Sequence, residues 1–163
     1  MARVLPFAAV LIGVATPAQA ADAAFCTALD GLRAEATSKN MPQRIAIIKE
    51  EAMTFACGRG ADVAVQAAFC DAALDQVGVE FTHAFPWYIE DCLSSAGVRP
   101  SMERVDQYTG IRGRKKIVRM WGQWRDGTRI DVQFEPSGDF GDRAKFRGYW
   151  GTYKLVVWRP ASI

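Results

Sequence analysis

Residues 116–135 read KIVRMWGQWRDGTRIDVQFE, and this stretch decides the fold class. Most of its bulky apolar side chains fall on even-numbered positions: Val118, Met120, Trp124, Ile130, Val132 and Phe134. In the second half of the stretch, mostly charged or amide residues stand between them. Alternation with a period of two is typical of a half-buried strand. Asp126-Gly127 separates the two runs, and this dipeptide favours a tight hairpin turn. The stretch therefore predicts two antiparallel strands.

The rest of the C-terminal half extends this sheet. Residues 146–158 predict a further strand, in which Gly148 and Gly151 suit bulge or turn positions, and Pro160 ends it. The preceding half has helical periodicity, and the strands follow one another with no helix between them. This order predicts an α+β fold with an antiparallel sheet of three or more strands. We expect one domain over residues 21–163, helical over 21–97 and a sheet over 101–160.

Three helices are expected before the sheet. The first covers residues 22–38, the second residues 42–57, and the third begins near Asp62. Their expected inner stripes are Phe25, Leu29 and Leu32 in the first helix, Ile45, Ile48, Ala52, Phe55 and Ala56 in the second, and Ala67, Cys70, Leu74 and Val77 in the third. Pro86 either kinks a long helix or begins a new one, and the sequence leaves both alternatives open.

The first 20 residues have the pattern of a signal peptide. Arg3 is followed by a mostly apolar run over residues 4–15, and Ala18-Gln19-Ala20 forms a small-x-small cleavage site. The run is shorter than the roughly 20 residues that span a bilayer. We expect a mature chain that begins at Ala21, has no transmembrane helix and is periplasmic or secreted. A retained anchor is the alternative. The 163 residues are 50% hydrophobic and 23% charged, which excludes a wholly disordered or polytopic membrane protein.

The four cysteines, Cys26, Cys57, Cys70 and Cys92, predict two disulfides, because an exported chain meets an oxidising compartment. Of three pairings we favour Cys26–Cys57 with Cys70–Cys92, since each would join the two arms of one helical hairpin. A third helix continuing through Pro86 would separate Cys70 from Cys92 too far to bond. One histidine and no closely spaced cysteine pair make a zinc site an unfavourable interpretation.

One short segment has catalytic potential. Glu80 and His83 stand three residues apart and would share a helix face, so His83 could act as a general base oriented by Glu80. Glu90 and Asp91 follow downstream, and two carboxylates across a cleft suffice for a small hydrolase of envelope glycans. The structural alternative is that His83 only caps a helix or forms a hydrogen bond near Pro86. The familiar nucleophile, phosphate-loop and metalloprotease motifs do not occur in the sequence.

The two halves of the mature chain differ in charge. Residues 21–100 contain 6 basic and 11 acidic residues, whereas residues 101–163 contain 13 basic and 7 acidic ones. Four cations cluster before the hairpin: Arg112, Arg114, Lys115 and Lys116. Such a cluster attracts an anionic glycan, a lipid headgroup or an acidic protein surface. The structural alternative is a charged sheet edge that discourages aggregation.

These patterns favour a non-catalytic exported protein that binds an envelope partner through its basic cluster. A small envelope hydrolase that uses Glu80, His83, Glu90 or Asp91 is the alternative. We expect no nucleic acid partner, since an exported chain rarely meets one, and no cofactor or metal.

Overall fold

A computed structural model of the chain describes residues 21–51, 54–59, 64–77, 84–106, 115–136 and 151–161. The elements in chain order are α1 (Ala23–Lys39), β1 (Gln43–Glu51), β2 (Thr54–Arg59), α2 (Ala64–Val77), α3 (Phe85–Ser95), β3 (Ser101–Asp106), β4 (Lys115–Gln123), β5 (Arg129–Pro136) and β6 (Gly151–Trp158). The expected signal peptide, residues 1–20, lies outside this part of the chain.

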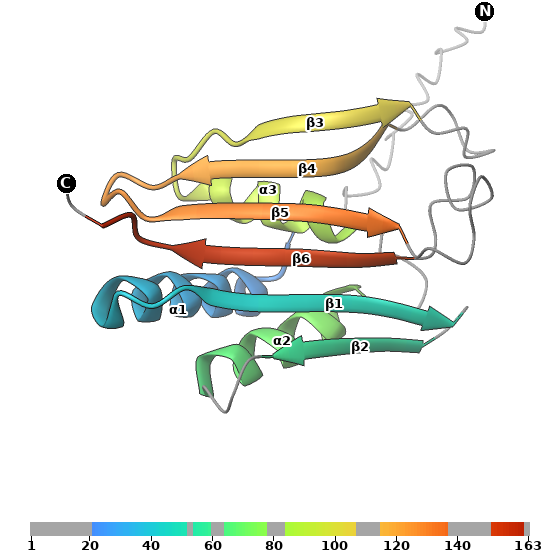
Figure 1. Ribbon diagram of the computed structural model, residues 1–163, viewed down its shortest axis with the longest axis horizontal. Coiled ribbons are helices and arrows are strands. Elements are labelled where there is room, and N and C mark those ends of the chain that lie inside the picture. The colour runs from blue at the N-terminus through green and yellow to red at the C-terminus, as the bar shows by residue number, and fades with distance from the viewer. Residues whose placement is uncertain are drawn as a thin grey trace, which may run out of the picture.

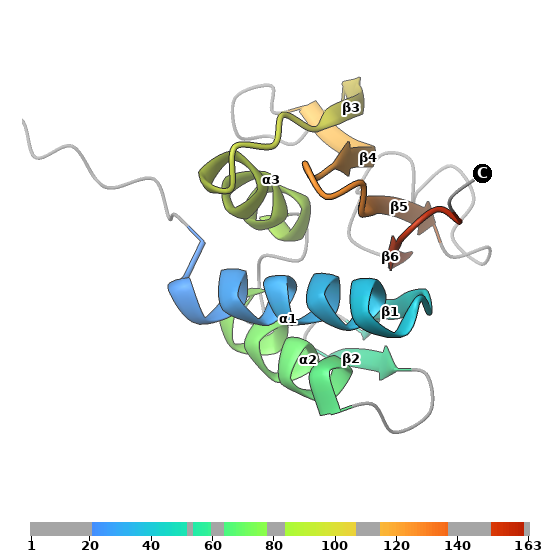
Figure 2. The same ribbon diagram turned by 90° about the vertical axis from the view of Figure 1, so that its left-hand side faces the viewer.

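The strands form one sheet in the order β2-β1-β6-β5-β4-β3, and every neighbouring pair is antiparallel (Figure 1). The three helices lie against one face of this sheet, so the described part of the molecule has two layers (Figure 2). The predicted α+β class with an antiparallel sheet is confirmed. None of the helices in the described ranges is long and apolar enough to cross a membrane.

The hairpin predicted around Asp126-Gly127 is present between β4 and β5. Gly127 has a φ of +85°, which glycine adopts readily, and the amide of Trp124 donates to the carbonyl of Thr128 at 2.9 Å. Trp124, Ile130 and Val132 are buried toward the helices, as their alternation indicates. Val118 is the exception. A register shift opposite β3 makes Ile117 the buried residue instead, and Val118 is only partly buried.

The helix expected over residues 42–57 is wrong, because this region is the β1–β2 hairpin. Gln43, Ile45 and Ile47 are buried while Arg44 is exposed, a period of two. The helical interpretation matched Ile45 with Ile48 and took Pro42 as a helix start. What overrides it is the pairing of β1 with β6, a strand more than 100 residues away in sequence.

Three described helices form the second layer, and α2 corresponds to the helix expected to begin near Asp62. The residues that α2 buries differ in part from those expected. Asp22 caps α1 by accepting from the amide of Ala24 at 3.0 Å. α2 buries Phe69, Cys70 and Ala73, whereas Leu74, expected to face inward, is 36% exposed. Pro86 lies in the first turn of α3, so it begins a separate helix rather than kinking a long one.

Aromatic rings fill the space between the layers. Phe25 from α1 lies 5.4 Å from the ring centroid of Phe69 and 6.1 Å from that of Phe85. Phe85 in turn lies 5.7 Å from Tyr153 of the central strand β6. Burying these rings and their aliphatic neighbours supplies most of the driving force for folding.

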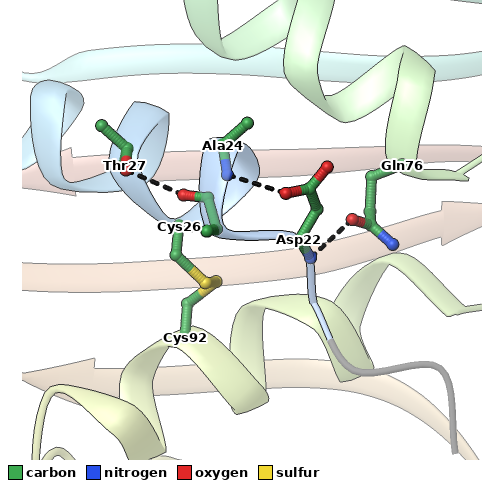
Figure 3. The surroundings of a disulfide bond; sticks show 7 residues. Asp22, Ala24, Cys26, Thr27, Gln76 and Cys92 are labelled. Carbon is green, nitrogen blue, oxygen red and sulfur yellow. Dashed lines mark hydrogen bonds between the residues drawn. A yellow bond between two sulfur atoms is a disulfide. The ribbon is translucent and has the colours of Figure 1, made fainter. Parts of the chain in front are cut away.

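All four cysteines form disulfides, as expected, but the expected pairing is wrong. Cys26 bonds Cys92, which joins α1 to α3, and Cys57 bonds Cys70, which joins β2 to α2. The expected pairing required Cys57 on a helix antiparallel to α1, and Cys57 lies on a strand instead. Figure 3 shows the Cys26–Cys92 bond beside a hydrogen bond that joins the start of α1 to α2. In it the amide of Asp22 donates to Gln76 Oε1 at 2.6 Å.

Candidate functional site

Four of the eight catalytic and binding residues expected from the sequence lie outside the described residues: Glu80, His83, Arg112 and Arg114. Lys115 and Lys116 begin β4, where they pair with Asp106 and Val105 at one end of the sheet. The structure describes only their backbone. The roles expected for the basic cluster and for the Glu80–His83 pair therefore stay predictions.

Glu90 and Asp91 lie on α3, and Glu90 contacts the sheet. Arg104 of β3 places Nη2 3.8 Å from Glu90 Oε2, and its guanidinium lies 5.0 Å from the ring centroid of Trp87. Burial raises the pKa of Glu90, and the positive charge of Arg104 opposes that rise. Asp91 is exposed. The arrangement ties α3 to the edge strand β3, which is a structural use of Glu90.

A second polar cluster joins α1 to the β4–β5 turn. Arg33 donates from Nε and Nη2 to Asp126 Oδ2 at 3.0 and 2.9 Å, and its guanidinium lies 5.4 Å from the Trp124 ring centroid. Burial alone would raise the pKa of Asp126, but hydrogen bonds from the Thr128 amide and from Arg33 lower it. Thr37 and Thr128 share a hydrogen bond of 2.9 Å beside them. The polar groups of these side chains form hydrogen bonds with one another. The cluster therefore acts as a clamp that holds α1 against the β4–β5 turn.

The face of the sheet opposite the helices carries a third and different arrangement. Described positions that alternate with the core project to this open face, and no described helix covers it (Figures 1 and 2). A shallow groove of about 380 Å³ crosses it, within the size range of small-ligand sites. The groove is lined by side chains from β1, β5 and β6 and the residue before β1: Pro42, Arg44, Asp131, Gln133, Lys154, Val156 and Trp158.

A neighbouring depression continues the groove toward β2. It shares Arg44, Lys154 and Val156 with the first and adds Ala46 and Gly58 from the open face. Gly58 and Ala46 are small, and a side chain at Gly58 would come within 3.6 Å of the Ala46 Cβ. The floor toward β2 is therefore low, with Arg44 and Lys154 beside it.

The ion pairs on the open face leave one cation of the groove without a counter-charge. Asp131 accepts from Arg119 at 2.7 Å, and Lys154 lies 2.6 Å from Glu135. Arg44, by contrast, has no ion-pair partner among the described residues and is exposed. Beside the groove, Trp121 is 42% exposed and lies 5.3 Å from the guanidinium of Arg119. The open face can therefore take up an anion at Arg44.

Sequence reasoning missed this groove because it assigned Arg44 to a helix. The alternation of Gln43, Arg44 and Ile45 was the available indication of a strand with one polar face. Even that indication would not have placed Arg44 near Trp158, because their neighbourhood depends on the pairing of β1 with β6.

Within the described part of the chain, no three histidine, cysteine or acidic side chains are grouped as metal ligands. Comparisons with protein-family models, with curated proteins and with solved structures found no match to this chain.

Proposed function

We propose that this protein is a non-catalytic binding protein of the cell envelope, and that its partner lies against the open face of the sheet. The observation that carries the proposal is the groove across β1, β6 and β5, in which Arg44 has no ion-pair partner among the described residues and lies beside apolar and amide side chains. Binding sites combine an apolar surface with a few placed polar groups, and this groove has both.

Support for an exported location comes from the cysteines and the N-terminus. One disulfide joins α1 to α3 and the other joins β2 to α2, and such bonds persist in oxidising compartments. The sequence before Ala21 has the charged, apolar and small-residue regions of a signal peptide. These two observations support the proposed periplasmic or secreted location.

The expected partner is an anionic ligand or an acidic protein surface. Arg112, Arg114, Lys115 and Lys116 would add long-range attraction, since they lead into β4 at the end of the sheet. In this proposal the basic cluster accelerates the encounter, whereas the groove holds the partner once it has arrived.

A blocking experiment tests this function. Because all four native cysteines are in disulfides, Gln133→Cys introduces a single free thiol in the groove, to which a maleimide polymer can be attached. Ala34→Cys, exposed on α1, receives the same polymer as the matched control. Each protein is immobilised and incubated with envelope extract, and the retained components are compared.

We expect the polymer at position 133 to abolish retention and the polymer at position 34 to leave it unchanged. Equal retention by both labelled proteins would place the partner elsewhere and contradict the proposal. A failure of the unlabelled protein to retain any component would contradict it as well.

A further inference from the structure

The chemistry of the groove also indicates what kind of ligand it takes. We propose that it binds a carboxylate-bearing oligosaccharide, with one sugar carboxylate on the guanidinium of Arg44 and a sugar ring against Trp158. This inference rests on the proposed function, because it names the class of partner for the same surface.

The strand register fixes the relative positions of the groove residues. Arg44, Val156 and Asp131 form one row across β1, β6 and β5, and Ala46, Lys154 and Gln133 form the next. Trp158 lies one row beyond Val156 on the same strand. Strands are about 4.8 Å apart and alternate residues about 6.6 Å apart, so the Arg44 and Trp158 backbones are about 8 Å apart. Two adjoining sugar rings can therefore reach both side chains.

Arg44 supplies the site for negative charge. Its planar guanidinium matches a carboxylate with two parallel hydrogen bonds, a geometry that a lysine ammonium cannot offer. Two carboxylates of the open face are already engaged by other cations, Asp131 by Arg119 and Glu135 by Lys154. An incoming carboxylate is therefore the natural counter-charge for Arg44.

The other polar groups of the groove favour a sugar over an acidic peptide. A sugar hydroxyl both donates and accepts hydrogen bonds, and the groove offers acceptors on Asp131, donors on Lys154 and both on the amide of Gln133. The ionised side chains of an acidic peptide only accept hydrogen bonds, so they could not donate to Asp131 as a sugar hydroxyl does.

The apolar part of the groove suits the same ligand. Trp158 and Pro42 line one end of it, and a flat indole ring can cover the apolar face of a sugar while its edge meets water. Ala46, Gly58 and Val156 keep the adjoining floor low. A flat, open groove with a shallow floor accommodates a chain of rings that continues past both ends.

Tetragalacturonate, a chain of four uronic acid sugars, is the probe for this proposal. Its binding to the disulfide-bonded protein is measured by calorimetry at low and moderate salt. The methyl ester of the same tetrasaccharide is the matched ligand, because it keeps the sugar rings and removes the charge. A glutamate tetrapeptide keeps the charge and removes the rings.

We expect tetragalacturonate to bind and both matched ligands to bind at least about tenfold more weakly. The methyl ester loses the charged hydrogen bonds to Arg44, and the glutamate peptide loses the ring contact with Trp158. Arg44→Gln and Trp158→Ala should each weaken binding by a similar factor. The controls are Arg125→Gln, an exposed arginine of the β4–β5 turn, and Trp121→Ala, an exposed ring outside the groove lining, and both should bind as the unaltered protein does.

Absence of tetragalacturonate binding would overturn the inference, as would equal binding of the methyl ester. Equal binding of the glutamate peptide would assign the groove to acidic peptides instead. An equal loss in Arg125→Gln would show attraction by overall charge rather than by the groove. If the sugar fails while the polymer at position 133 still blocks capture, this inference is wrong and the proposed function stands.

Discussion

The two faces of the sheet differ in everything except the strands that form them. The face toward the helices buries apolar and aromatic side chains and has both disulfides on its side. The open face has charged, amide and aromatic side chains around a shallow groove. One face therefore holds the molecule together and no described helix covers the other, so stability and binding should respond to different substitutions.

The largest effect is expected from two tryptophans close together in sequence. Trp124 is 3% exposed toward the helices, whereas Trp121 is 42% exposed on the other face. Trp124→Ala should lower the free energy of unfolding by about 3–5 kcal/mol, because it leaves a cavity under Arg33. Trp121→Ala should cost about 1 kcal/mol or less. Denaturant unfolding measures both, and equal losses would refute the division between the faces.

The two disulfides should differ in their contribution to stability. Cys26 and Cys92 are 66 residues apart in sequence, and Cys57 and Cys70 are 13 apart. Because a longer loop loses more entropy in the unfolded chain when it is closed, replacing the first pair by alanine should cost about 4 kcal/mol and the second about 3 kcal/mol. Denaturant unfolding of the two double variants checks the order, and the reverse order would contradict it.

A smaller effect concerns the clamp between α1 and the β4–β5 turn. The pKa of Asp126 is lowered in the folded protein, so its contribution to stability is present above its unfolded pKa. It is lost as the pH falls through the folded value. Asp126→Asn should therefore lower the free energy of unfolding by about 1 kcal/mol at neutral pH. In this variant the free energy of unfolding should also fall less steeply as the pH is lowered. Thermal melts from neutral pH down to the acid range measure it, and an unchanged acid slope would contradict it.

The smallest effect on stability belongs to the basic cluster. Reversing Arg114, Lys115 and Lys116 to glutamate should leave the melting temperature nearly unchanged. The same change should abolish capture of an anionic partner, and capture by the unaltered protein should weaken as salt is raised. Capture that survives the reversal, or that ignores salt, would assign the interaction elsewhere.

The hairpin around Gly127 could be predicted because its information is local. Alternation and the Asp126-Gly127 turn occur within one short stretch. The structure confirms the turn, and it confirms the alternation except at Val118. The β1–β2 hairpin could not be predicted in the same way. Ile45 and Ile48 fit a helical stripe, whereas Ile45 and Ile47 fit a strand, and only the pairing with β6 decides between them.

The errors in disulfides and site follow from that one ambiguity. Once residues 42–57 are treated as a helix, Cys57 faces the wrong partner and Arg44 loses its place on a sheet face. Trp158 was placed on a strand from the sequence, but its position near Arg44 depends on a register that the local pattern does not contain. The sequence shows the types of the groove residues, but it does not predict which of them are neighbours in space.

The position of β6 in the sheet delays the completion of folding until the end of the chain is available. β6 is the last strand of the chain, yet it lies between β1 and β5 and is the only described strand that joins β2-β1 to β5-β4-β3. Until residues 151–158 are available, the facing edges of β1 and β5 stay unpaired and the six-stranded sheet cannot form. A chain that is exported N-terminus first, as proposed, would stay incompletely folded until its last segment follows. A chain truncated after Pro136 would keep the two-stranded β2-β1 and the three-stranded β5-β4-β3 as separate fragments, each with an unpaired strand edge.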